Sequence, residues 1–264
     1  MLIAAAVCPH PPLLIPEATG APGVGEAELE RLRAACHQAV AGLLQEGPDL
    51  VAVVGGARCT AEYRPDAAGS LHEFGVPFTV GVSADSPGDR DDAPVFSLSL
   101  TIGRWLLSRA ATHTEPPQIA WWGIASDAAP AECLELGEKL AALAPRVAVL
   151  AMGDGPGRRA RGAPGAADPE ADRYDDQVAA SLAAADPGAL AALDPSQDRQ
   201  LLIAGRAAWQ VLAGAAAHAV FDADLRYFAA PFEVTYFVAS WRRTHPGQAR
   251  PSRLPDRPWV RRRR

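Results

Sequence analysis

The sequence predicts an α/β protein, a single three-layer α/β/α domain around a mixed, mainly parallel central sheet. Short, wholly apolar runs such as 2–7 and 50–56 alternate with amphipathic segments. This alternation is typical of strands that are buried on both faces between layers of helices. The chain has 264 residues, enough to bury a substantial core, so we expect one domain over residues 1–243.

The elements can be assigned in order along the chain. Apolar residues recur at helical spacing over 26–46, and Gly47-Pro48 ends this predicted helix. The run 50–56 is too short for a helix, which predicts a central strand parallel to the first strand. The same patterns predict strands at 77–82, 118–125 and 147–152, helices at 94–112, 127–143, 172–185 and 198–217, and a closing hairpin of 219–228 with 232–241.

Charge is distributed unevenly along the chain. The net charge is −6, yet arginines crowd the C-terminal end, so the rest of the chain is distinctly acidic. We therefore expect no nucleic-acid partner. Proline and arginine dominate 244–264 without any apolar period, which predicts a disordered tail. No stretch approaches the roughly 20 apolar residues of a membrane span, so we expect no membrane partner.

The cysteines favour a reducing compartment. Cys8, Cys36, Cys59 and Cys133 are widely spaced and include no CxxC pair. This spacing suggests neither a zinc ribbon nor a secreted disulfide scaffold, so we expect a cytoplasmic protein. The sequence leaves open whether the chain forms a homo-oligomer.

The most informative segment follows the first predicted strand. There, Cys8-Pro9-His10-Pro11-Pro12 places an imidazole on a backbone that the prolines restrict. In open α/β sheets, ligands bind beyond the carboxyl ends of the strands. His10 is therefore a candidate site residue, although local sequence alone also fits a surface histidine without a role.

Other candidate residues follow the second and fifth predicted strands. If these strands are parallel neighbours of the first, their ends bring Cys8, Arg58, Cys59 and Asp154 toward one crevice with His10, and Arg158 follows shortly after. Simpler explanations exist, because free cysteines beside strands are usually buried and an aspartate between glycines is a common turn residue. The side chains that we consider as metal ligands are His10, Glu62, His72 and Glu233.

Four segments together resemble the class III extradiol ring-cleavage dioxygenase (LigB-like) superfamily, specifically an actinobacterial branch of it. The resemblance runs from Met1 to about Arg243. Its segments are CPHPPLLIPE at 8–17, VVGG at 53–56, MGDG at 152–155 and APFEVTYFVASW at 230–241.

The resemblance implies a single α/β/α domain and, in active members, an Fe(II) ion held by two histidines and a carboxylate. A catecholic substrate and oxygen would bind its open positions. Only the first ligand carries over, as His10. Where the family has its second ligand histidine this chain has Arg58 and Cys59, and where the family has its catalytic histidine it has Gly157 and Arg158.

Two interpretations follow from these departures. In the first, the protein is an oxidoreductase that rebuilds an Fe(II) site around His10 with Glu62, His72 or Glu233. In the second, it is a non-catalytic relative without a cofactor. That relative would bind a small aromatic or anionic molecule, or a protein partner, with His10, Arg58 and Arg158.

Overall fold

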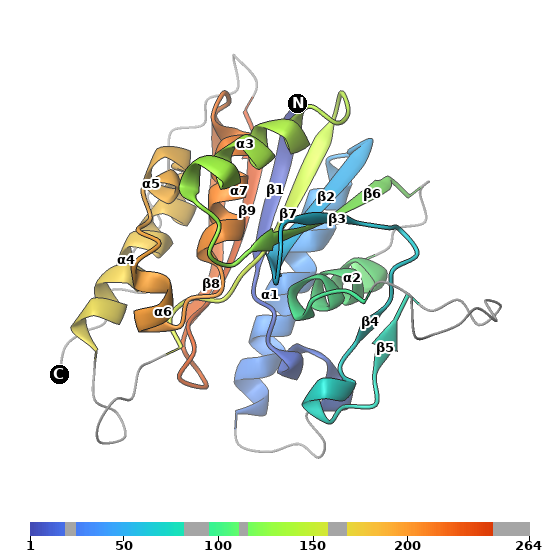
Figure 1. Cartoon of the computed structure of the whole chain (residues 1–264), viewed down its shortest axis with the longest axis vertical. Coiled ribbons are helices and arrows are strands. Elements are labelled where there is room, and N and C mark those ends of the chain that lie inside the picture. The colour runs from blue at the N-terminus through green and yellow to red at the C-terminus, as the bar shows by residue number, and fades with distance from the viewer. Residues whose placement is uncertain (19–24, 82–94, 111–115, 158–167, 245–264) are drawn as a thin grey trace.

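A seven-stranded mixed sheet forms the centre of the molecule (Figure 1). The computed structural model describes residues 1–18, 25–81, 95–110, 116–157 and 168–244. The strands of this sheet are β1 (Leu2–Cys8), β2 (Leu50–Ala57), β3 (Ala61–Tyr63), β6 (Gln118–Ala125), β7 (Val147–Met152), β8 (Phe221–Ala229) and β9 (Tyr236–Arg243). Their order is β3-β6-β2-β7-β1-β9-β8, and the four central strands β6, β2, β7 and β1 are parallel.

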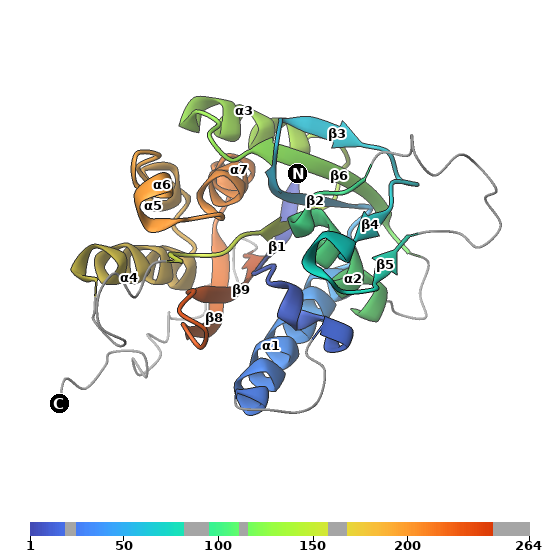
Figure 2. The same cartoon turned by 60° about the horizontal axis from the view of Figure 1, so that its bottom comes forward.

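Helices cover both faces of this sheet (Figure 2). The helices are α1 (Glu26–Gln45), α2 (Leu98–Ala110), α3 (Pro130–Ala141), α4 (Pro169–Ala184), α5 (Pro187–Ala191), α6 (Gln197–Leu201) and α7 (Arg206–Ala216). One face carries α1 and α2, and the other carries α3 to α7. The predicted α/β class and its three-layer arrangement around a mainly parallel sheet are therefore confirmed.

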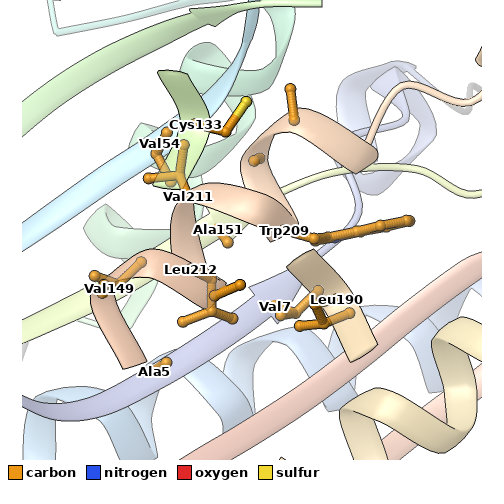
Figure 3. Packing of buried hydrophobic residues seen from close by; sticks show 14 of the residues in the cluster. Ala5, Val7, Val54, Cys133, Val149, Ala151, Leu190, Trp209, Val211 and Leu212 are labelled. Carbon is orange, nitrogen blue, oxygen red and sulfur yellow. The ribbon is translucent and has the colours of Figure 1, made fainter. Parts of the chain in front are cut away.

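The central strands divide the core into two apolar layers. All six residues of β7 are buried, and they alternate between the two sides of the sheet. Val149 and Ala151 face α7, where they lie near Val211 and Leu212 (Figure 3). Leu150 faces the layer of α1 and α2. Because both faces are covered, the strand sequence is continuously apolar, as the sequence pattern indicated.

Within the layer of α3 to α7, helices α3 and α7 pack closely because they meet at glycines. A Cβ at Gly137 would collide with the carbonyl oxygen of Val211, and a Cβ at Gly214 would collide with that of Leu134. The two helix backbones therefore touch directly. Only glycine permits such an approach, so both positions are required by packing.

The structure corrects two predicted elements. The helix expected over 198–217 is divided into α6 and α7, because Leu202 adopts a left-handed φ of 53° and ends α6. Of the strand expected over 77–82, the described part, 77–81, forms only the two-residue strand β5 (Thr79–Val80), which pairs with β4 (Gly69–Ser70) in a separate small sheet. The short β3 and α5 were not predicted, and they lie in segments without a clear apolar period.

The other predicted elements are present with small shifts of their ends. The closing hairpin is confirmed, since β8 and β9 pair antiparallel and β9 also pairs with β1. Residues 245–264 of the expected tail lie outside the described residues, as do the ends of the helix expected over 94–112. Among the described helices, none combines the length and the apolar character needed to cross a membrane.

Candidate functional site

The ends of β1 and β7 bring His10 and Asp154 into contact. Cys8 is the register partner of Met152, and each candidate residue lies two positions further along its chain. The backbone N–H of His10 donates to Oδ1 of Asp154 over 2.7 Å. The imidazole Nδ1 lies 3.6 Å from the same oxygen. The predicted meeting of the first and fifth strand ends is therefore confirmed for this pair.

This pair is poorly hydrated. His10 is 8% exposed, and its buried Nδ1 has no hydrogen-bond partner within the described part of the chain. Burial raises the pKa of Asp154, whereas the neighbouring His10, through its charge and its backbone N–H, opposes this rise. The site therefore offers a partly desolvated carboxylate next to an imidazole whose Nδ1 has unused hydrogen-bonding capacity.

The start of β9 adjoins the loop that carries Asp154. Gly155 N–H donates to the carbonyl oxygen of Thr235 over 2.8 Å, and Thr235 N–H donates to that of Pro156 over 3.0 Å. The Thr235 hydroxyl also donates to Oδ2 of Asp175 over 2.8 Å. Burial and the charge of Asp154 raise the pKa of the adjacent Tyr236. Thr235 and Tyr236, at the start of β9, thus form one wall of the site.

The start of α7 adjoins the same loop on another side. Ala204 N–H donates to the carbonyl oxygen of Asp154 over 3.2 Å. A Cβ on Gly153 would collide with the Cα of Gly205 and lie 3.0 Å from Nε1 of Trp209. Gly153 is therefore required for the close contact between β7 and α7.

Arg58 and Cys59 lie on the turn that connects β2 with β3. The Thr60 hydroxyl accepts from Ala125 N–H at the end of β6 and donates to Glu132. The chain after β2 consequently runs toward β6 and not toward β7 and β1. Both Arg58 and Cys59 are exposed. The convergence of these two residues with His10 and Asp154 stays a prediction.

The cysteine that precedes His10 is enclosed in the core. Cys8 is 0% exposed, and so is Cys36 of α1. The pKa of the Cys36 thiol is raised mainly by burial and, to a smaller extent, by a hydrogen bond with the Cys8 thiol. Cys8 therefore acts here as a small buried residue, which is the simpler of the two explanations that its sequence position allowed.

The side chains considered as metal ligands are spread over the molecule. Glu62 is exposed on the edge strand β3, and His72 is exposed in the short 3₁₀ turn His72–Phe74. Glu233 is exposed in the turn between β8 and β9, with a φ of 62°. Among the described residues, no three His, Cys, Asp or Glu side chains form a group that could hold a metal ion.

The described residues thus do not fit the facial set of two histidines and a carboxylate that a non-haem Fe(II) centre needs. Arg158 lies outside the described residues. The sequence pattern did not single out Thr235, Tyr236 or Asp175. Asp175 follows Glu170 and Asp172 on α4 and resembles a solvated position, and only the packing of α4 against the start of β9 reveals its burial.

The protein is thus a three-layer α/β protein with a buried His10 beside a half-buried Asp154 at the carboxyl edge of its parallel strands. No family model and no curated protein matches the chain. Among solved structures, it is similar to an uncharacterized protein, JW3007, from Escherichia coli K12. The two share 14% sequence identity and a TM-score of 0.48, over 90% of this chain and 99% of that chain.

Proposed function

We propose that this protein is a LigB-like relative that binds a small hydroxylated aromatic molecule at the carboxyl edge of its sheet without a resident iron centre. The observation that carries the proposal is the contact between His10 and Asp154. The resemblance supports a hydroxylated aromatic ligand. The separation of Glu62, His72 and Glu233 from this site supports a site without iron, because His10 and Asp154 would supply only two of the three side-chain ligands that the metal needs.

The chemistry of the pair suits a hydroxyl group better than an anion. A half-buried carboxylate accepts strong hydrogen bonds from phenolic O–H groups, and it repels an anionic ligand. Arg58, one of the two arginines that would favour an anion, lies on the turn toward β6, and Arg158 lies outside the described residues. In this proposal Asp154 accepts from a ligand hydroxyl, and His10 supplies a second hydrogen-bonding group beside it.

Two measurements test the proposal. The first is calorimetric titration of the purified protein with catechol under anaerobic conditions, with benzoate as an anionic comparison. We expect catechol to bind more tightly than benzoate. We expect His10→Gln and Asp154→Asn each to weaken catechol binding by roughly tenfold or more, since the first removes the imidazole and the second replaces one carboxylate oxygen and its charge with a neutral amide group. His218→Gln, an exposed position just after α7, should leave binding unchanged.

The second measurement is the metal content after purification with and without added Fe(II). We expect substoichiometric iron, and catechol binding that does not depend on added iron. Stoichiometric iron that is lost in His10→Gln, together with oxygen consumption in the presence of catechol, would instead establish the oxidoreductase interpretation. Tighter binding of benzoate than of catechol would establish an anion site.

The proposal includes a reducing, cytoplasmic location. Its support is that all four cysteines are free thiols in this structure, and three of them are buried. Resistance of the native protein to disulfide formation during aerobic storage, followed by mass spectrometry, tests this part.

A further inference from the structure

The segment that carries His10 has very few backbone donors. Pro9, Pro11 and Pro12 lack an N–H group, so His10 supplies the only amide donor between Cys8 and Leu13. That donor is used by Asp154. The hydrogen bonds that fix this segment therefore have to come from its carbonyl groups and from the residues that follow it.

The residues that follow form a single 3₁₀ turn, Pro12–Leu14. Leu14 N–H donates to the carbonyl of Pro11, and Ile15 N–H donates to that of Pro12, each over 3.0 Å. A turn this short leaves the carbonyls at its C-terminal end without partners inside the turn. These are the carbonyls of Leu13 and Leu14.

Arg33 of α1 satisfies both of these carbonyls. Its Nη2 donates to Leu13 and its Nε donates to Leu14, each over 3.0 Å. The guanidinium group is planar and presents its donors in a fixed fork, so the two bonds fix the orientation of the turn as well as its position. Arg33 is only 6% exposed, so these bonds are shielded from water.

The charge of Arg33 is balanced on its own helix. Nη1 donates to Glu26 over 2.8 Å and to Glu30 over 2.7 Å. Helix α1 is in turn tied to the hairpin of β8 and β9, because the Tyr227 hydroxyl donates to Glu28 over 2.7 Å. Arg33 thus connects the His10 segment to a helix that is itself anchored to the sheet.

We propose that Arg33 is a positioning residue for His10, and that it sets the orientation of the imidazole beside Asp154 by capping the turn after it. This inference deepens the proposed function, because it names the group that holds the ligand-binding pair in place. Leu14 and Ile15 are 0% exposed and anchor the turn through apolar contacts. We therefore expect Arg33 variants to fold while the His10 segment loosens.

The test compares Arg33→Met with Arg31→Met. Arg31 lies on the same helix and pairs with Glu28, and its side chain is 71% exposed. We expect Arg33→Met to speed hydrogen exchange of the Leu14 and Ile15 amides by about tenfold or more, because local opening of the turn becomes easier. Arg31→Met should leave this exchange unchanged.

A spectroscopic measurement reports on His10 itself. The ¹⁵N shifts of the His10 ring are expected to change in Arg33→Met, because the distance from Nδ1 to Asp154 is no longer held, and to remain native in Arg31→Met. Catechol affinity should fall in Arg33→Met. In Arg33→Lys, the hydrogen-exchange rates of Leu14 and Ile15 should lie between those of wild type and Arg33→Met, since a single ammonium group cannot reproduce the planar fork of the guanidinium group.

Native exchange at Leu14 and Ile15 together with native His10 ring shifts in Arg33→Met would overturn the inference. If Arg33→Met does not fold, Arg33→Lys is measured in its place. Native hydrogen exchange at Leu14 and Ile15 in Arg33→Lys would then overturn the inference. Neither readout needs a ligand. A wild-type protein that fails to bind catechol would therefore refute the proposed function while the exchange and the ring shifts still decide the role of Arg33.

Discussion

The backbone N–H of His10 donates to Oδ1 of Asp154 over 2.7 Å, although the two residues are 144 positions apart in the chain. The bond involves the main chain of His10, so it persists when the imidazole is replaced. A His10→Gln variant consequently removes the ring and keeps the strand ends together, and it reports on the imidazole alone.

The pKa of Asp154 predicts a pH-dependent effect of Asp154→Asn on stability. Burial raises the pKa of this carboxyl group in the folded state. Its contribution to stability is therefore fully present below the ordinary aspartate pKa and is lost as pH rises through the folded value. The asparagine variant lacks this loss and keeps an acceptor for His10. We expect its stability relative to wild type to increase from roughly pH 4 to pH 7, measured by urea unfolding.

Asp194 provides a control for which the pH dependence of stability is expected to run in the opposite direction. Hydrogen bonds from the Ser196 side chain and backbone lower the pKa of Asp194. Its contribution is present above the ordinary pKa and is lost as pH falls through the folded value. Asp194→Asn should therefore lose stability relative to wild type as pH rises. The same pH trend for both variants would contradict the assignment for Asp154.

Arg206 is predicted to be essential for stability. It is 1% exposed and donates to Asp198 over 2.6 Å, to Gln210 over 2.7 Å, and to the carbonyls of Ser126 and Ala128 over 2.9 Å. Arg206→Met leaves a partly buried carboxylate without its partner, so we expect a loss of about 3–5 kcal/mol in urea unfolding.

Two further variants separate the charge from the packing at Arg206. Adding Asp198→Asn to Arg206→Met should recover part of the loss, because the uncompensated charge is removed. Arg64→Met, which breaks an exposed ion pair with Asp66, should leave the unfolding midpoint unchanged. Equal effects of Arg206→Met and Arg64→Met would contradict the buried network.

Leu202→Gly is predicted to stabilise the protein. Leu202 adopts the left-handed conformation, with φ 53°, and is 53% exposed. Glycine adopts this conformation without steric cost, so we expect a gain of about 1 kcal/mol by thermal or urea unfolding. Ala180→Gly, at an exposed interior position of α4, should instead destabilise by about 1 kcal/mol. Destabilisation by both substitutions would show that the Leu202 side chain contributes more than its backbone costs.

The thiols are predicted to differ sharply in reactivity. Cys59 is exposed, whereas Cys8, Cys36 and Cys133 are buried. Burial raises the pKa of Cys133 to about 11, so little thiolate forms near neutral pH. We expect iodoacetamide to label Cys59 alone in the native protein, as measured by mass spectrometry, and to label none in Cys59→Ser. Rapid labelling of Cys8 or Cys36 would show that the β1 end opens readily.

The order of strands and helices was largely predictable, because the burial of a strand or helix fixes the pattern of apolar residues along its sequence. A strand covered on both faces is continuously apolar, as β7 is, and α1 repeats apolar residues at helical spacing. The break between α6 and α7 was not predictable, because an apolar pattern continues through it. The left-handed turn at Leu202 and the contact of Gly205 with Gly153 arise from docking against β7.

The fold class, the central strands and the candidacy of His10 could be predicted from the amino-acid sequence, because each depends on residues that are close together in the chain. Which distant side chains meet could be seen only in the folded molecule. Packing joins His10 with Asp154, brings Arg33 to the carbonyls of Leu13 and Leu14, and directs the turn with Arg58 and Cys59 toward β6. It also placed Glu62, His72 and Glu233 apart from a common metal site. The physical reason is that strand order and loop direction depend on packing between elements, which no local pattern encodes.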